Sequence, residues 1–355
     1  MAKSPIAKKF GIKTGEPIYY ARKKCPGVLV FAADHGLYQQ YSDRLYELFL
    51  EYTDQIERFS VDECFLDMTY FIRKGETLLE KAKEINKRVE AELGFTVNVG
   101  VSTNKLLAKM ASDFEKPNKV HTLFLEEIET KMWPLPIAEL FMVGRKTLPK
   151  LERMHIRTIG DLAKYDKEVL AKEFGKHGKL MWEYANGIDN ARVEYEQNDP
   201  KAIGNSITLP KDIDQISKLK EILLSLIEKI TYRLRKHEMY ATVVNVQLKT
   251  NEFKVVSHQK KIQIATNSTK EIYLMAAELL EELYQGQPIR LIGARVDGLC
   301  KEKERQLSIF DKAQDQKQKN LDQVLDRLKD RYGYTTITRA GEMNLKNIFD
   351  HEQKN

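Results

Sequence analysis

Two adjacent carboxylates, Asp62 and Glu63, stand in an apolar, strand-like stretch of the sequence. The apolar residues around them are Ile56, Phe59, Val61, Phe65 and Leu66. Burying two neighbouring anions among apolar side chains is costly unless a cation neutralises them. Carboxylate oxygens suit magnesium or manganese better than zinc. The pair therefore indicates a divalent-metal site, and the alternative interpretation is a solvent-exposed pair at a turn.

The position of the pair in its strand limits how it can act. Adjacent side chains of a regular strand point to opposite faces. Asp62 and Glu63 can therefore reach one metal site only at a strand end, a bulge or a hairpin tip.

The elements predicted around the pair alternate between helix and strand. Helical periodicity marks residues 34–52 and 78–93, and alternating apolar residues over 95–101 predict a strand. Ser102 or Thr103 can cap the helix that follows. This succession predicts an α+β domain with helices on one side of an antiparallel sheet.

The same region resembles the palm of the Y-family translesion DNA polymerases, of the UmuC/DinB type. The runs that carry the resemblance are Tyr38-Gln39-Gln40-Tyr41-Ser42, Tyr52-Thr53, Ile56-Glu57 and Ser60-Val61-Asp62-Glu63-Cys64-Phe65-Leu66-Asp67. The resemblance extends over about residues 4–310. It implies that Asp62 and Glu63 are catalytic and help to hold two Mg²⁺ ions, or Mn²⁺ ions, at the primer end.

The resemblance implies a multidomain α+β polymerase built like a right hand. Its expected parts are partial fingers (1–33), a ferredoxin-like palm (34–124), a helical helix-hairpin-helix thumb (125–192), a linker (193–201), a β-α-β-β-α-β little finger (202–300) and a tail (301–355). Residue patterns alone also predict the little finger, because its strand and helix periods follow one another in that order.

Two lysines gain a role from the resemblance. Lys8 stands where a basic residue of the fingers contacts the incoming triphosphate, and Lys116, in the run Lys116-Pro117-Asn118, stands where a palm lysine does so. A point cation suits this task because charge develops on the leaving pyrophosphate. The alternative interpretations are a solvated helix face for Lys8 and a solvated turn for Lys116.

The family palm begins with a strand that carries a first metal-binding aspartate and a nearby aromatic residue that excludes ribonucleotides. Both would lie upstream of Met1. The resemblance therefore implies that one of three metal ligands is missing from the sequence. Translesion synthesis in the repair of DNA damage, as part of an SOS response, is the first functional hypothesis. The second is a catalytically defective protein that binds DNA and the sliding clamp.

The expected DNA contacts lie in the second half of the chain. Gly144, Arg145 and Lys146 belong to a run that resembles a helix-hairpin-helix, which holds DNA phosphates through backbone N–H groups. Met142 replaces the usual first glycine of this hairpin. The predicted little-finger strands carry the basic residues Lys249, Lys260, Lys261 and Arg295. A basic sheet face can track phosphates, although a solvated sheet face is the alternative.

An apolar island interrupts the polar tail. Gln306-Leu307-Ser308-Ile309-Phe310 resembles the sliding-clamp-binding motif of bacterial polymerases, with Gln306, Leu307, Ile309 and Phe310 as its contacts. A later amphipathic segment suggests no function from its sequence; its apolar residues are Leu321, Val324, Leu325 and Leu328.

Composition agrees with an intracellular nucleic-acid partner. The 58 lysines and arginines exceed the 52 aspartates and glutamates, for a formal charge of +6. The three cysteines are widely separated and suit a reducing cytosol. No apolar run approaches the ~20 residues of a membrane span. We therefore expect a cytoplasmic bacterial protein whose partners are primed or damaged DNA, a dNTP and the clamp, with no membrane.

Overall fold

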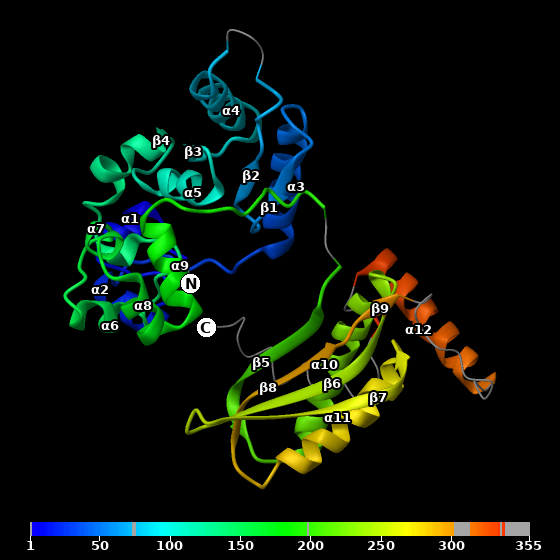
Figure 1. The fold of residues 1–355 in the computed structure, drawn as a ribbon. Helices are drawn as coiled ribbons and strands as arrows, with labels where there is room; N and C mark the ends of the chain where they lie inside the picture. The colour runs from blue at the N-terminus through cyan, green and yellow to red at the C-terminus, as the bar shows by residue number, and fades with distance from the viewer. Residues whose placement is uncertain (1, 73–75, 197–198, 302–312, 334–335, 338–355) are drawn as a thin grey trace. The chain divides into compact units, whose positions relative to one another are not determined.

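The computed structural model describes residues 2–72, 76–196, 199–301, 313–333 and 336–337, with side chains left undescribed over 313–319. The chain divides into two compact units, Met1–Gln197 and Asn198–Asn355 (Figure 1). Each unit has its own buried apolar core. The mixed helix and sheet content agrees with the expected α+β class.

Two short helices open the first unit. α1 (Pro5–Lys9) begins after Ser4, whose hydroxyl accepts a hydrogen bond from the Ala7 N–H at 3.1 Å. α2 (Ile18–Lys24) follows and is only seven residues long. Helices this short depend on packing rather than on intrinsic stability.

The next part of the first unit packs two long helices against a hairpin. α3 (His35–Leu50) and α4 (Leu78–Leu93) cover the antiparallel strands β1 (Ile56–Arg58) and β2 (Cys64–Leu66). Their shared core includes Leu45, Phe49, Ile56, Ile85 and Val89. A capping box fixes the start of α4, because Thr77 and Glu80 satisfy each other's backbone N–H groups.

The prediction of one antiparallel sheet in this region is wrong for the described residues. β3 (Val99–Val101) pairs in parallel with β4 (Val120–Thr122), as a separate two-stranded sheet. A parallel pair needs a crossover, which here is α5 (Lys105–Asp113). The N-cap of α5 is Asn104 rather than Ser102 or Thr103, and its side-chain oxygen accepts from the Leu107 N–H at 2.9 Å.

Gly100 allows β3 to lie directly against α5. A Cβ atom on this residue would meet the carbonyl oxygen of Ala108 at 1.8 Å and the backbone nitrogen of Ser112 at 2.7 Å. Backbone atoms cannot swing aside as a side chain can, so only glycine fits. The position of α5 relative to the strands therefore depends on this contact.

A group of short helices completes the first unit. They are η1 (Leu125–Glu127), η2 (Ile128–Met132), η3 (Ile137–Glu139), α6 (Leu148–Arg153), α7 (Ile159–Ala163), α8 (Lys167–Phe174) and α9 (Lys176–Ala185). Their core includes fully buried Leu151, Ile159, Leu170 and Met181, and it is continuous with Leu107 of α5. The helical group and α5 therefore share one core.

The second unit has the predicted β-α-β-β-α-β order. Its elements are β5 (Ala202–Ile213), α10 (Ile216–Lys236), β6 (Met239–Thr250), β7 (Val255–Thr266), α11 (Thr269–Leu283) and β8 (Ile289–Asp297), with the short β9 (Cys300–Lys301) beside β6. The long strands lie in the order β5-β8-β6-β7, all antiparallel. α10 and α11 pack on one face of this sheet and bury its core (Figure 1).

The last helix, α12 (Ala313–Tyr332), docks on α10 through charged side chains. Arg235 binds both carboxylate oxygens of Asp326, at 2.6 and 2.8 Å. Lys329 pairs with Glu228 at 3.0 Å, and both side chains are almost fully buried. Leu321 and Val324 remain exposed. The amphipathic pattern therefore predicts a helix here correctly, but the charged side of that helix, and not its apolar side, packs on the domain.

We predict that Gly100→Ala lowers the free energy of unfolding of the first unit by about 3 kcal/mol, because β3 and α5 must separate. Urea unfolding followed by circular dichroism would measure the change. Gly144→Ala is the matched control, since a Cβ there meets no atom within 4 Å. Equal destabilisation by the two variants would contradict the close-contact explanation.

We predict that Lys329→Ala releases α12, because it leaves the Glu228 carboxylate buried without this ammonium. Breaking such a pair from one side costs about 3–5 kcal/mol. Hydrogen exchange should show faster exchange at the amides of residues 320–332, whereas the exposed neighbour Arg327→Ala should leave them protected. Unchanged protection in Lys329→Ala would show that other contacts hold the helix.

Candidate active site

Asp62 and Glu63 lie at the tip of the β1–β2 hairpin. The tip is closed by backbone hydrogen bonds from the N–H groups of Phe59 and Ser60 to the carbonyl oxygen of Glu63, at 3.0 and 3.1 Å. This is one of the geometries that lets adjacent carboxylates serve one site. The expectation drawn from strand alternation therefore agrees with the structure.

The pair is less buried than its apolar context indicated, with Glu63 only partly buried. Asp62 is exposed, and the neighbouring apolar residues Phe59 and Val61 are 45% and 51% exposed. Asp62 accepts a hydrogen bond from the Ser60 hydroxyl at 2.7 Å. The tip projects beyond the core that holds Ile56, so the desolvation cost of the two anions is smaller than the sequence suggested.

Lysines of α5 neutralise the carboxylates of the hairpin. Lys109 donates to Glu63 at 2.6 Å, and Lys105, one turn earlier, donates to Glu57 at 2.5 Å. The side chains of Lys109 and Lys105 are largely buried, at 14% and 15% exposure. The signal for these contacts is the i,i+4 spacing of the lysines, which sequence reasoning missed.

A second carboxylate continues the chain of charges from Lys109. Lys109 also contacts Asp113 at 3.1 Å, and Asp113 contacts Lys116 at 2.6 Å. Burial alone would lower the pKa of the Lys109 ammonium, but hydrogen bonds to Glu63 and Asp113 outweigh it and raise that pKa above its usual value. Burial likewise opposes the ionisation of Asp113, and its two lysine partners outweigh that effect and lower its pKa.

These side chains share one cleft within the first unit. The cleft has a volume of about 1710 Å³, and Asp62, Glu63, Lys109 and Lys116 line it. Apolar side chains of α3 and α4 and the strands β2 and β3 line it as well. The structure thus places the predicted carboxylates and Lys116 in one site. Lys8, which α1 carries, is not among the lining residues, so the structure does not bring it to this cleft.

The segment after α9 fixes the start of α5 beside the hairpin. The Asp189 carboxylate accepts from the Leu106 N–H at 3.0 Å, and Asn104 donates to the carbonyl of Gly187 at 2.9 Å. The Glu194 N–H donates to Glu57 at 2.7 Å. These contacts hold the helical group, α5 and the hairpin together, which sets the position of Lys105 and Lys109.

The donor chemistry of the hairpin tip fits a hard divalent cation in part. Asp62 and Glu63 offer carboxylate oxygens on an open cleft, which suits magnesium or manganese. Among the residues that the structure describes, no group of three or more His, Cys, Asp or Glu side chains could hold a metal. The pair can thus supply two ligands, and the expectation that the sequence lacks the third, a first aspartate, stays a prediction.

In the second unit, three of the four predicted basic residues lie on the uncovered face of the sheet. Lys261 is opposite Val243 and Arg295 is opposite Asn245, while Val244 and Val246, which alternate with these partners, are buried under the helices. Lys249 follows the same alternation and lies on the uncovered face. Lys260 is the exception: it lies on the helix-covered side and pairs with Glu278 of α11 at 3.0 Å.

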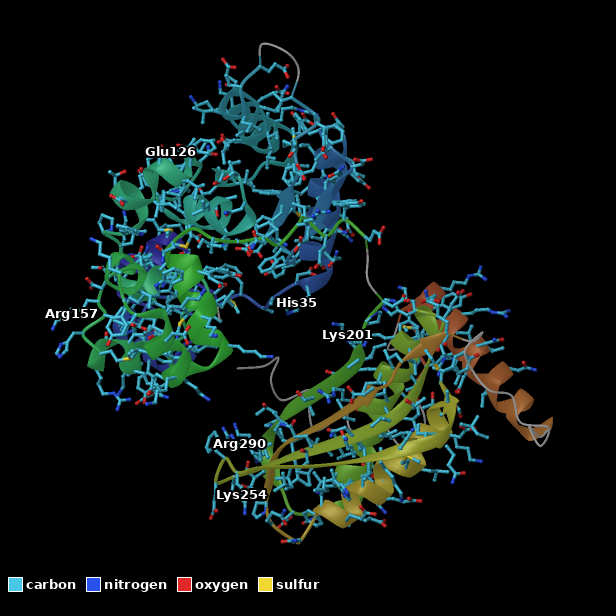
Figure 2. The ribbon with its side chains drawn as sticks, viewed as in Figure 1. His35, Glu126, Arg157, Lys201, Lys254 and Arg290 are labelled. Carbon is cyan, nitrogen blue, oxygen red and sulfur yellow. The ribbon has the colours of Figure 1, made fainter. Side chains whose placement is uncertain are left out.

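An aromatic residue at one end of this sheet was missed by sequence reasoning. Phe253, in the β6–β7 turn, is 60% exposed with a positive φ of 67°. The Lys249 ammonium lies 4.6 Å from its ring centre, and the Arg290 guanidinium lies 5.2 Å from it. Lys254 and Arg290 lie at the same end of the unit (Figure 2). An exposed ring between cations could have been suspected from the run Asn251-Glu252-Phe253-Lys254.

The predicted thumb residues form an exposed turn. Gly144, Arg145 and Lys146 lead into α6, and the N–H groups of Thr147 and Leu148 bind the carbonyl of Gly144 at 3.0 and 3.1 Å. Met142, in the place of the usual glycine, has a positive φ of 72°. A left-handed conformation is the one for which glycine is normally used, so Met142 is strained there.

The proposed clamp motif, Gln306, Leu307, Ile309 and Phe310, lies outside the described residues. No helix in the described part of the chain is long and apolar enough to cross a membrane.

Three family models match the chain. Residues 1–113 match the impB/mucB/samB family, residues 200–309 match the C-terminal domain of that family, and residues 139–189 match the DNA polymerase-iota thumb domain.

Curated relatives match nearly the whole chain. DNA polymerase IV of Clostridium acetobutylicum is 46% identical over 340 residues, covering 96% of this chain and 86% of the relative. DNA polymerase IV of Acetivibrio thermocellus is 37% identical, with the same coverage of both chains. DNA polymerase IV 2 of Bacillus subtilis is 36% identical, covering 97% of this chain and 85% of the relative.

Solved structures resemble the fold. A Y-family DNA polymerase chimera of Dbh and Dpo4 matches with a TM-score of 0.74 and 26% identity, over 83% of this chain and 86% of the chimera. An insertion ternary complex of Dbh DNA polymerase matches with a TM-score of 0.56 and 26% identity, over 84% of this chain and 87% of that one.

Proposed function

This chain belongs to the Y family of DNA polymerases, and we propose that it extends primers across damaged template bases. It is a DNA-directed DNA polymerase, a nucleotidyltransferase that acts in translesion synthesis. The observation that carries the proposal for the site is the hairpin tip, where Asp62 and Glu63 share one cleft with Lys109 and Lys116. The partners are DNA and a nucleotide.

The reaction joins the primer 3′-oxygen to the α-phosphorus of the dNTP and breaks the bond to pyrophosphate. The hydroxyl proton leaves to solvent, and negative charge builds on the leaving group. Lys116, which lines the cleft, would neutralise that charge as a point cation. Lys8 was predicted to do the same from the fingers, but nothing in the cleft supports that role.

Asp62 and Glu63 would hold magnesium, or manganese, at the primer end. A divalent metal in such a site lowers the pKa of an attacking hydroxyl and stabilises charge on the phosphoryl oxygens. Glu63 accepts a hydrogen bond from the Lys109 ammonium at 2.6 Å, so one positive charge of the protein already neutralises this carboxylate. The choice between the two metals follows from ligand chemistry alone.

The second hypothesis, DNA and clamp binding without catalysis, is not favoured. The 46%-identical relative that covers 96% of the chain is a named polymerase, and the hairpin carboxylates and Lys116 meet in one cleft.

We propose two DNA-contacting surfaces, each within its own unit: the turn Gly144–Lys146 in the first unit, and the uncovered sheet face in the second. Lys249, Lys261 and Arg295 support the second surface by their shared face, and Lys260 does not. Such contacts would grip phosphates without reading sequence. We also propose that Gln306–Phe310 binds a sliding clamp, on sequence resemblance only, and that the protein works in the bacterial cytoplasm during the SOS response.

We predict that Asp62→Asn lowers single-nucleotide insertion by about 100-fold or more. A metal contact at the reacting phosphate is worth several kcal/mol, and each 1.4 kcal/mol is tenfold in rate. Primer extension with Mg²⁺ on primed DNA would measure it. Asp67→Asn is the control, since that carboxylate lines the same cleft but already accepts from Thr69 at 2.6 and 2.9 Å. Full activity of Asp62→Asn would refute the assigned site.

We predict that Lys261→Ala weakens binding to primed DNA and reduces the salt dependence by about one phosphate contact, a change of about 0.9 in the slope of log K against log salt. The adjacent Lys260→Ala is the matched control, because Lys260 lies on the opposite face and pairs with Glu278. Fluorescence anisotropy at several salt concentrations would measure both. A loss in Lys260→Ala as large as in Lys261→Ala would rule out the uncovered face as the DNA surface.

A further inference from the structure

We propose that Asp113 is a positioning residue that, anchored by Lys109, holds Lys116 in place for the triphosphate of the incoming nucleotide. The inference rests on the proposed function and deepens it. It starts from a linear arrangement of alternating charges, Glu63–Lys109–Asp113–Lys116, with successive separations of 2.6, 3.1 and 2.6 Å. Asp113 is the link between the lysine that touches the hairpin and the lysine that faces the nucleotide.

The stability of α5 does not explain this carboxylate. Asp113 is the last residue of α5, where the helix dipole disfavours an anion. Lys109 precedes it by four residues, and a lysine N-terminal to the acid is the weaker order of an i,i+4 pair. The dipole opposes an aspartate at this position and the i,i+4 pair stabilises the helix only weakly, so helix stability alone gives little reason for this carboxylate.

Simple attraction of the triphosphate does not explain it either. A negative charge beside two lysines reduces the positive potential of the cleft and would weaken binding of a polyanion. A gain in the order of the Lys116 side chain can offset this loss of attraction. Lys116 is 56% exposed on a flexible four-carbon side chain, and fixing such a chain costs up to about 2 kcal/mol of rotamer freedom.

Asp113 therefore fixes the Lys116 ammonium before the nucleotide arrives. Its second oxygen contacts Lys109, which is held on its other side by Glu63. Lys109 has little room to move, since its side chain is only 14% exposed. The buried lysine thus anchors Asp113, and Asp113 in turn orients the exposed lysine.

Removing the charge of Asp113 changes dNTP affinity in opposite directions under two explanations, one in which Asp113 positions Lys116 and one in which it only screens the lysines. In Asp113→Asn, loss of positioning predicts about tenfold weaker dNTP binding, whereas loss of a screening anion predicts tighter binding. The measurement is the equilibrium dissociation constant of the complementary dNTP with the full chain on a dideoxy-terminated primer, where no chemistry follows. Steady-state insertion should show the same rise in KM with a change in kcat below about threefold.

Glu115→Gln is the matched control. It removes one negative charge two residues away, from a carboxylate that contacts only exposed Lys119 at 3.6 Å among the salt bridges of the described residues. It should leave the dNTP dissociation constant within about twofold of wild type. Asp113→Glu, which keeps the charge, should recover part of the lost affinity, and DNA affinity without dNTP should not change in any of these variants.

A double substitution tests whether Asp113 acts through Lys116. In a Lys116→Met background, Asp113→Asn should cause little further loss, because the side chain that it orients is gone. Tighter dNTP binding by Asp113→Asn, or additive losses in the double variant, would overturn the inference. The wild type could insert nucleotides and bind dNTP while Asp113→Asn shows the same dNTP dissociation constant as Glu115→Gln. In that case the positioning role of Asp113 is refuted and the proposed function stands. A wild type that neither inserts nor binds dNTP would overturn the proposed function as well.

Discussion

The site depends on the electrostatic pairing of one helix with one hairpin. α5 places Lys105 and Lys109 one turn apart, so that they meet Glu57 in β1 and Glu63 at the hairpin tip. Without these cations, Glu57 and Glu63 would lie close together on a short hairpin, where they would repel each other and any incoming phosphate. The lysines instead bring the acidic hairpin and the proposed phosphate-binding residue Lys116 into one cleft.

Packing makes this pairing possible. Gly100 lets β3 touch the backbone of α5, and the segment after α9 holds the first residues of the helix through Asp189 and the Gly187 carbonyl. The buried core of the helical group continues into α5 through Leu107. The lysines are therefore carried by an element that is fixed on several sides, which suits groups that must meet a substrate with little reorganisation.

The two units use charge in different ways. In the first, the pair Lys109–Glu63 borders an open cleft. In the second, the buried pair Lys329–Glu228 and the partly buried pair Arg235–Asp326 lie between α10 and α12 and hold the last described helix on its domain. Charge on the uncovered sheet face is different again, since Lys261 and Arg295 point away from the helices and suit a polyanion.

The sequence by itself determined the features that obey local rules. Strand alternation limited a shared site for Asp62 and Glu63 to a strand end, a bulge or a hairpin tip, and periodicity predicted the β-α-β-β-α-β order of the second unit, because these patterns depend only on near neighbours. Tertiary structure decided the rest. Register made Lys260, and not Lys261, the residue that faces the helices, the parallel pairing of β3 with β4 replaced the expected antiparallel sheet, and α12 turned its charged side inward. Each of these depends on contacts between residues far apart in the chain, which no local pattern encodes.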